Sequence, residues 1–582
     1  MSISTRWRNM VDADNVLPEY PRPQLVRDEW INLNGVYDYV ITQMGSKWPE
    51  KFTGKILVPF CIESELSGVC KPLEPGELLW YKRKFTIPES YDGKKILLHF
   101  GAVDWKAKVY VNSSLVGGHT GGYCPFTVDI TACAKTGENE LVVSVYDPTD
   151  EGWQQRGKQV LEPHGFWYTA TSGIWQTVWL EAVDETYIKD IKITPNIDKE
   201  RIHLIVDIEN KCELHATIKD GDKVIFDNKI TNNEFISIPE PVYWSPENPH
   251  LYDIEISVLD GNKVCDKVKS YFGMRKFSIE NDEKGLPRLC LNNKPYFQRG
   301  LLDQGYWCES LLTAPTDESM IYDIQKMKDL GFNMLRKHIK IEPARWYYHC
   351  DRLGMIVWQD MVSGGEYIGT LTAGVLPLLN VKLKDNNYKR FKRGNIQARI
   401  GFNRELFEML DYLYNFPSIG CWVPFNEGWG QFDAADIYAR IKAFDSTRIV
   451  DHASGWYDQG CGDLNSVHKY ILKIKPPKQP DRKRPFVLSE FGGYSRVCEN
   501  HTFDENKSFG YKMFKDEKEL TTAYKKLIEE QVAPLIEKGL SATVYTQVSD
   551  VEREVNGIMT YDREIVKIDE ETIKEMNKKL SY

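Results

Sequence analysis

From residue 277 to residue 582, short apolar runs alternate with segments whose apolar residues recur at helical spacing. Because each run is rich in β-branched and aromatic residues and is bounded by turn residues, we interpret eight of them as strands. They span 296–302, 332–338, 354–361, 419–427, 448–455, 464–470, 485–493 and 542–550. Helices are predicted at 316–330, 343–352, 396–414, 434–443 and 520–538. This alternation predicts a (β/α)8 TIM barrel. A doubly wound open sheet is the alternative. We would expect such a sheet to carry a glycine-rich phosphate loop after a strand, and the sequence contains none.

The residues before the predicted barrel are typical of two all-β domains. Residues 1–184 contain many short strands with glycine and asparagine turns, and apolar and polar residues alternate clearly in 108–112 and 177–181. This pattern predicts a jelly-roll β-sandwich. Residues 185–276 contain strands about ten residues apart, which favours a small immunoglobulin-like β-sandwich. A chain of 582 residues is too long for one hydrophobic core, in agreement with three domains and a barrel at 277–582.

Composition excludes several classes of protein. The net charge is −10 and no basic patch dominates the chain, so we expect no nucleic-acid partner. No run of 18 apolar residues predicts a membrane span, and the first 20 residues lack the apolar region of a secretory signal. The 12 cysteines are scattered without CxxC pairs, which argues against a zinc site and suits a reducing compartment. We therefore expect a cytoplasmic protein; a homo-oligomer is left open.

Two glutamates end two of the predicted strands. Run 419–427 stops at Asn426-Glu427 before Gly428, and run 485–493 carries Glu490 just before a glycine pair. In a barrel, the carboxyl ends of the strands meet at one rim, so the two carboxylates should face each other. Such a pair suits the cleavage of a glycosidic bond, in which one carboxyl protonates the leaving oxygen and the other attacks the anomeric carbon. A pair of structural salt-bridged glutamates is the alternative.

Several stretches resemble one known family over essentially the whole chain. They are Arg299-Gly300, 323–336, 346–360, Phe425-Asn426-Glu427 and 489–493 in the barrel, with 244–252 and 272–275 in the second domain. On these motifs the chain resembles glycoside hydrolase family two, the group of β-galactosidases, β-glucuronidases and β-mannosidases. The resemblance implies a sugar-binding-like sandwich, an immunoglobulin-like domain and a catalytic barrel.

The resemblance also implies roles for individual residues. Glu427 would be the general acid/base and Glu490 the nucleophile of a retaining mechanism, with the carboxylates roughly 5 Å apart. Asn426 would donate a hydrogen bond to the 2-hydroxyl of the sugar, Arg336 would keep Glu490 ionised, and Tyr470 would donate its hydroxyl to the nucleophile. The mechanism needs no cofactor, and we expect no metal site.

Other polar and aromatic residues at the predicted strand ends are further candidates for substrate binding: Asp303, Gln304, His338, Trp456, His468 and Tyr545. The segment 154–175 of the sandwich is long and aromatic, and we expect it to form a loop that reaches the barrel mouth. The Asn-x-Lys element that reads a carboxylate in the family's glucuronidases is not evident near Asn556, where the chain reads Asn-Gly-Ile.

The sequence thus predicts an exo-acting retaining β-glycosidase that removes a terminal sugar from an oligosaccharide or glycoside. A β-galactoside is the first expectation, on the frequency of that activity in the family, and glucuronide, mannoside and arabinoside remain open. Two further readings are a catalytically silent carbohydrate-binding protein and an endo-acting enzyme, which would need an open groove.

Overall fold

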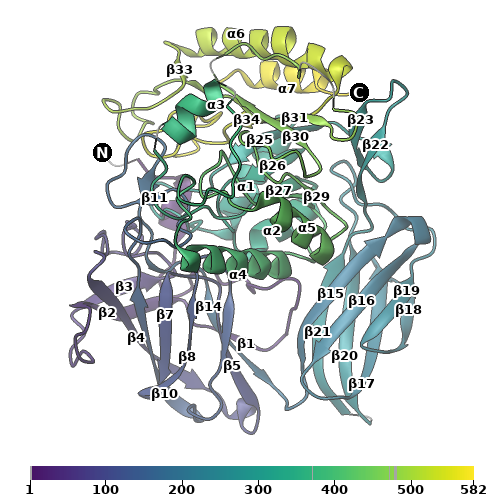
Figure 1. Cartoon of the computed structure of the whole chain (residues 1–582). Helices are drawn as coiled ribbons and strands as arrows, with labels where there is room; N and C mark the ends of the chain where they lie inside the picture. Colours follow the sequence, from purple (N-terminus) through teal and green to yellow (C-terminus); the bar gives the residue numbers. More distant parts are fainter. Residues whose placement is uncertain (1–2, 262, 370, 380, 471, 478–480) are drawn as a thin grey trace.

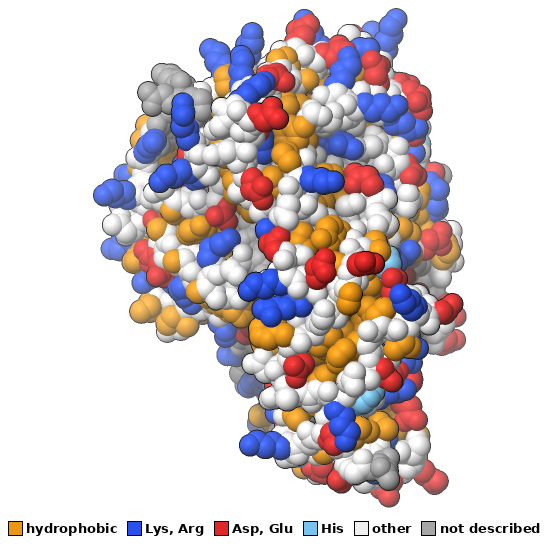
Figure 2. Space-filling view, turned by 90° about the vertical axis from the view of Figure 1, so that its right-hand side faces the viewer, with side chains coloured by type: hydrophobic (Ala, Val, Ile, Leu, Met, Phe, Trp, Pro, Cys, Tyr) orange, Lys and Arg blue, Asp and Glu red, His pale blue; other side chains and the backbone are white. Residues whose placement is uncertain are grey.

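The computed structural model describes residues 3–582, apart from 262, 370, 380, 471 and 478–480. Two β domains lie side by side at the bottom of Figure 1, and the barrel lies above them with its C-terminal helices at the top. Within the described residues, none of the helices has both the length and the apolarity needed to cross a membrane. On the face shown in Figure 2, acidic and basic side chains are interspersed and form no large patch of one sign.

The first domain is a sandwich of a four-stranded and a six-stranded antiparallel sheet, with strand orders β1-β14-β5-β9 and β3-β2-β4-β10-β7-β8. Buried side chains such as Leu98, Val109 and Val143 fill the space between the sheets. The predicted β-sandwich is therefore confirmed. The strands are β1 (Trp30–Asn32), β2 (Gly35–Gln43), β3 (Gly54–Val58), β4 (Glu77–Ile87), β5 (Lys95–Phe100), β7 (Lys106–Val111), β8 (Ser114–Thr120), β9 (Phe126–Asp129), β10 (Gly137–Tyr146) and β14 (Val178–Val183).

The second domain is a smaller sandwich of three and four strands, in the orders β15-β16-β19 and β18-β17-β20-β21. Apolar residues alternate with polar ones along its strands, so one face of each sheet packs into the core and the other meets solvent. The immunoglobulin-like prediction is confirmed. The strands are β15 (Ile188–Asn196), β16 (Arg201–Ile208), β17 (Glu213–Asp220), β18 (Lys223–Ile230), β19 (Asn233–Ser237), β20 (Tyr252–Asp260) and β21 (Lys263–Phe272).

The third domain is the predicted barrel of eight parallel strands, in the order β29-β28-β27-β26-β25-β34-β31-β30. Strand β28 is a continuous apolar run because both of its faces are buried, one in the barrel lumen and one under the helices. Between β29 and β30, at the ends of this order, the hydroxyls of Ser454 and Ser466 lie 3.3 Å apart. The strands are β25 (Gln298–Asp303), β26 (Met334–Lys337), β27 (Ile356–Asp360), β28 (Ile419–Val423), β29 (Ile449–Val450), β30 (Asn465–Lys469), β31 (Phe486–Gly492) and β34 (Leu540–Thr546).

The barrel helices begin and end near the predicted residues. They are α1 (Asp317–Asp329), α2 (Ala344–Leu353), α4 (Ile396–Tyr412), α5 (Ala434–Phe444), α6 (Glu517–Leu527) and α7 (Glu570–Lys579). A capping box of Thr316 and Ser319 starts α1, and Gly354 ends α2 with a φ of +77°. The predicted helix 520–538 is α-helical only to Leu527 and continues in π and 3-10 turns, because Pro534 has no N–H for the helical ladder. The sequence did not anticipate α7.

A small antiparallel sheet and one tryptophan contribute to the core of the barrel. The sheet consists of β22 (Phe277–Asn281), β23 (Pro287–Leu291) and β24 (Lys294–Pro295). Its Leu289 packs in one cluster with lumen residues such as Met334 and Val487 and with Trp244 of the second domain. The lumen is therefore a packed core, as in other barrels of this kind, and active sites of such barrels lie at the rim formed by the strand C-termini.

An arm of the first domain reaches the barrel rim, as expected from the sequence of 154–175. It contains the paired strands β11 (Gln159–Val160) and β12 (Tyr168–Thr169). The backbone N–H groups of Arg156 and Gly157 both donate to the Ser363 carbonyl, at 3.1 and 3.0 Å. On the other side, the Thr169 N–H donates to Glu552 at 2.9 Å. The arm is thus fixed to two separate barrel loops.

Candidate active site

Glu427 lies four residues beyond β28, so the prediction that strand 419–427 carries it to its end was wrong. The strand stops at Val423 because the next residue, Pro424, has no N–H to pair. Glu427 then adopts a φ of +52°, and its N–H donates to the Ser454 carbonyl at 3.0 Å. A left-handed backbone at a residue other than glycine is strained, and such strain concentrates at functional sites.

Glu490 lies within β31 and is 3% exposed. The pairing of β31 with β34 is irregular between Leu488 and Phe491, on either side of Glu490. An irregularity of this kind re-aims side chains at a barrel rim. As a result, ligand atoms of Glu490, Glu427 and His468 all lie within 4.8 Å of one another.

The hydroxyl of Tyr470 lies between the two carboxylates. It donates to Oε2 of Glu490 and lies 3.3 Å from Oε1 of Glu427. The Tyr470 ring is stacked on Tyr511 with centroids 4.2 Å apart, which fixes its orientation. Two carboxylates this close are spaced for direct nucleophilic attack, since the inverting arrangement needs room for a water between them.

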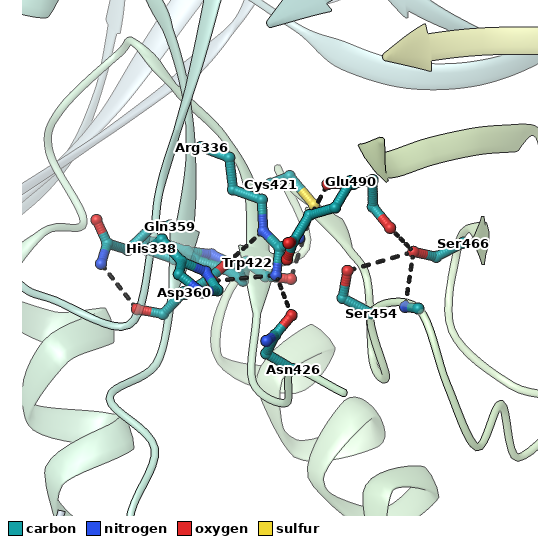
Figure 3. A network of polar contacts seen from close by, with 12 residues as sticks. Arg336, His338, Gln359, Asp360, Cys421, Trp422, Asn426, Ser454, Ser466 and Glu490 are labelled. Atoms are coloured by element: carbon teal, nitrogen blue, oxygen red, sulfur yellow. Dashed lines mark hydrogen bonds and ion pairs between the residues drawn. The ribbon is translucent and has the colours of Figure 1, made fainter. Parts of the chain in front are cut away.

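A buried network around Arg336 holds Glu490 and Asn426 in place (Figure 3). The Arg336 guanidinium binds Asp360 through two hydrogen bonds of 2.8 and 3.0 Å. It also donates to Glu490 Oε1 at 3.0 Å and to Asn426 Oδ1 at 2.9 Å. Because Oδ1 of Asn426 accepts from Arg336, its amide nitrogen is left to donate elsewhere.

This network sets the charge of Glu490. Burial on its own would raise the pKa of the Glu490 carboxyl, but nearby His468, His338 and Arg336 and the Tyr470 hydrogen bond outweigh it and lower that pKa below its usual range. Burial lowers the pKa of His338 well below 6.5, so at neutral pH the Arg336 guanidinium, whose own pKa is raised by Asp360 and Glu490 despite its burial, acts on Glu490 without help from a His338 charge. Glu490 is therefore an ionised carboxylate at neutral pH, as a nucleophile must be.

Two histidines complete the polar surface of the site. Nδ1 of His338 lies 2.7 Å from Asp360 Oδ2, and Nδ1 of His468 lies 2.7 Å from Glu427 Oε1. Glu427, His468 and Glu490 are close enough to offer ligands to a metal ion. However, Arg336 and Tyr470 already bond Glu490, so the set is satisfied by its own hydrogen bonds.

Both glutamates line a cavity of about 500 Å³, which is large enough for a sugar and part of its aglycone. Its walls carry aromatic rings, which suit stacking against the C–H faces of a sugar: Trp167, Tyr367, Trp429, Trp456, Tyr470 and Tyr511. Trp167 belongs to the arm of the first domain and meets Trp429 edge to face at 4.9 Å. A second cavity, of about 400 Å³, is lined by residues of all three domains, including Gln176, Asp190 and Arg345, and contains neither glutamate.

The structure brings most of the predicted site residues to this cavity. The predicted residues that line it are Gln304, His338, Asn426, Glu427, Trp456, His468, Tyr470 and Glu490. Arg336 is fully buried behind them and acts through Glu490 and Asn426.

Two predicted substrate-binding residues do not face the cavity. Asp303 is turned to Lys337, whose ammonium donates to it at 2.6 Å. Tyr545 lies in β34 on the face that packs under the helices, against Phe491 and Tyr524. In β34 the neighbouring Val544 points into the lumen, so alternation along the strand sends Tyr545 the other way.

The sequence analysis did not predict four groups of residues that line the cavity. They are Lys158 and Phe166 of the arm, Tyr367 and Ile368 after β27, Tyr511 after β31, and Glu554 after β34. None lies at a strand end, so the strand pattern could not identify them. Only the expectation that 154–175 reaches the barrel mouth pointed to the arm.

Comparison with known proteins agrees with this fold and site. The description "Glycosyl hydrolases family 2" fits three successive parts of the chain: a sugar binding domain at 62–183, the family's middle domain at 186–275 and its TIM barrel domain at 288–575. A "Beta-galactosidase" of Thermoanaerobacter pseudethanolicus is 28% identical over 439 residues, which cover 71% of this chain and 54% of that protein. The chain spans about half the length of the curated relatives it matches.

Solved structures resemble the chain in fold. A β-D-glucuronidase of Dictyoglomus thermophilum has a TM-score of 0.75 at 17% identity, covering 96% of this chain and 98% of that one. A family 2 β-galacturonidase of Eisenbergiella tayi has a TM-score of 0.71 at 18% identity, with coverages of 96% and 98%. The order of the three domains agrees with that of the matched family models. The chain belongs to glycosyl hydrolase family 2.

Proposed function

We propose that this glycoside hydrolase is an exo-acting β-glycosidase that works with retention of configuration. The observation that carries the proposal is the pair Glu427 and Glu490, whose carboxylate oxygens approach within 4.8 Å at the rim of one cavity. Retaining enzymes place their two carboxyl groups about 5–5.5 Å apart, whereas inverting enzymes need about 6.5–9.5 Å.

In the first step, the ionised Glu490 attacks the anomeric carbon while Glu427 gives its proton to the leaving glycosidic oxygen. The aglycone departs as an alcohol, and the sugar remains bound as an ester of Glu490. Arg336 and Tyr470 hold the attacking carboxylate in place through their hydrogen bonds. The free amide nitrogen of Asn426 is available to donate to the 2-hydroxyl of the sugar.

In the second step, Glu427 accepts a proton from a water molecule, which attacks the same anomeric carbon and displaces Glu490. Two displacements on opposite faces return the original β configuration. His468 donates to or accepts from Glu427 at 2.7 Å, so it positions that carboxyl for both proton transfers.

The proposal has two more specific parts: the enzyme acts on the end of the sugar chain (exo mode), and its substrate is a β-galactoside. The arm of the first domain is fixed to two barrel loops and covers one side of the cavity, which favours a pocket for one terminal sugar over an open groove. Curated relatives are named "Beta-galactosidase" and "Putative beta-glucuronidase", and two solved structures of similar fold are named as a glucuronidase and a galacturonidase. A β-galactoside remains our first expectation.

The test is a panel of p-nitrophenyl β-glycosides assayed with the wild-type chain and with Glu490→Ala. We expect turnover of at least one glycoside by the wild type and its loss in the variant. Added azide should then restore aryl release from Glu490→Ala and give the α-glycosyl azide, because azide enters the space left by the carboxylate. Activity close to wild type in Glu490→Ala would exclude this assignment, and binding of sugars without any turnover would favour the carbohydrate-binding alternative.

A further inference from the structure

A chain of buried side-chain amides runs from the wall of the cavity to Glu554. The Gln304 amide donates to Gln547 Oε1 at 2.8 Å, and the Gln547 amide donates to Asn556 Oδ1 at 2.8 Å. The Asn556 amide then donates to Glu554 Oε1 at 2.9 Å. All four side chains are at most 3% exposed, and the two at the ends, Gln304 and Glu554, line the cavity.

The carboxylate at the end of this chain fixes the direction of every hydrogen bond in it. Both Glu554 oxygens accept hydrogen bonds, Oε1 from Asn556 and Oε2 from Tyr168, so Asn556 presents its NH2 group to Glu554. The Oδ1 of Asn556 can then only accept, so Gln547 must donate its N–H to it. The Oε1 of Gln547 is left facing Gln304 and likewise accepts from the Gln304 N–H. One N–H of Gln304 is therefore used within the chain, and Gln304 can offer its carbonyl oxygen and its second N–H to the cavity.

Glu554 itself keeps capacity for further donors. Its Oε2 accepts from the Tyr168 hydroxyl of the arm, and its Oε1 accepts from Asn556. A carboxylate has about four acceptor positions, so about two remain for a ligand. The Glu554 end of the amide chain thus offers only acceptors to a molecule in the cavity, whereas the Gln304 end can both accept and donate.

The other walls of the cavity carry acidic and basic side chains. Glu490 adds negative charge, and burial lowers the pKa of His338 well below 6.5, so His338 adds no positive charge at neutral pH. Lys158 and Lys469 also line the cavity. The Lys158 ammonium lies 5.5 Å from the centroid of the Tyr168 ring, and no ion pair joins it to Glu554 among the described residues, so it is the cation that a uronate would have to reach.

We infer that Glu554 selects a neutral terminal sugar, whose hydroxyls donate to it, and rejects a uronic acid. At neutral pH the carboxylate of a uronic acid has no proton to donate, so it would face acceptors and a like charge in a buried wall. This inference rests on the proposed glycosidase activity. It separates the chain from the similarly folded proteins that are named as a glucuronidase and a galacturonidase.

The experiment compares kcat/KM for p-nitrophenyl β-galactoside and β-glucoside with that for the β-glucuronide and β-galacturonide. We expect the wild type to prefer the better neutral substrate by at least about 100-fold, the loss expected when a buried charge is left unpaired. In Glu554→Gln, the neutral substrate should lose about 10- to 100-fold, because a hydrogen bond to a charged acceptor is replaced by a neutral one. The ratio of uronide to neutral activity should rise at least tenfold.

Two variants serve as controls. Glu552→Gln changes another buried glutamate of the same loop, which binds the Thr169 N–H and does not line the cavity, so its substrate ratio should stay as in the wild type. Lys158→Met tests the opposite reading, in which this lysine binds a uronate. A wild type that prefers uronides, a collapse of uronide activity in Lys158→Met, or an unchanged ratio in Glu554→Gln would each overturn the inference and leave the glycosidase proposal standing. A wild type without activity on any glycoside would overturn both.

The folding of Glu554→Gln is judged by its thermal midpoint. If this variant does not fold, the test uses the ratio of uronide to neutral activity in the wild type and in Glu554→Asp. Aspartate keeps the charge but withdraws it from the cavity, so it should weaken the neutral substrate without admitting the uronide. Admission of the uronide by Glu554→Asp would contradict exclusion by charge.

Discussion

The amide of Asn426 gives the sharpest prediction about transition-state binding. Asn426 is 7% exposed, and its Oδ1 is held by Arg336 at 2.9 Å, so its Nδ2 is the donor available to the sugar 2-hydroxyl. Asn426→Asp keeps an acceptor for Arg336 but has no donor to offer. We expect a loss of about 2–3 kcal/mol in transition-state stabilisation, or about 30- to 150-fold in kcat/KM, because the hydrogen bond strengthens as the oxocarbenium ion forms.

The assay uses a matched pair of substrates, the p-nitrophenyl β-glycoside that the enzyme prefers and its 2-deoxy counterpart. The new charge of Asn426→Asp beside Glu490 affects both substrates alike, so the difference between them isolates the contact with the 2-hydroxyl. The variant should lose at most about threefold on the 2-deoxy substrate beyond that common effect. Equal losses on the two substrates would refute the assignment of the Asn426 amide to the 2-hydroxyl.

Two further predictions concern stability. Arg336→Met leaves Asp360 and Glu490 buried without their cation, so we expect urea denaturation to show a loss of about 3–5 kcal/mol, and a loss under 1 kcal/mol would argue against the network. For His338, burial lowers the folded pKa below 6.5, so the unfolded chain binds more protons as the pH falls and the free energy of unfolding decreases. We expect this decrease between pH 7 and pH 5 and a smaller decrease in His338→Gln, as measured by urea denaturation at both pH values; equal pH dependence in both proteins would contradict the account.

The fold could be predicted from sequence because its strands carry a strong local signal. Strands buried on both faces, such as β28, are continuous apolar runs, and the intervening helices have a clear apolar period. Burial on both faces of a strand also makes it difficult to predict which side of the barrel wall each side chain points to. In β34 both faces are buried and neither is distinctly polar or apolar, so the sequence could not show that Tyr545 packs under the helices instead of lining the site.

The residues of the candidate site that lie on strands or at strand ends could be predicted from the sequence, whereas those that lie on other loops could not. Glu490 and His468 lie on strands, and the strand pattern alone places them at one rim. Lys158 comes from another domain and Glu554 from a loop after β34, and their approach depends on contacts such as Tyr168 to Glu554 across nearly 400 residues. Local periodicity carries no information about such contacts.

The stereochemistry of the first product tests the central geometric claim most directly. Proton NMR can follow the anomeric signal of the sugar released from a β-glycoside before mutarotation. With the oxygens of Glu427 and Glu490 within 4.8 Å, the β anomer should appear first, because no water fits between the carboxylate and the anomeric carbon. Initial release of the α anomer would contradict the double displacement and the roles assigned to both glutamates.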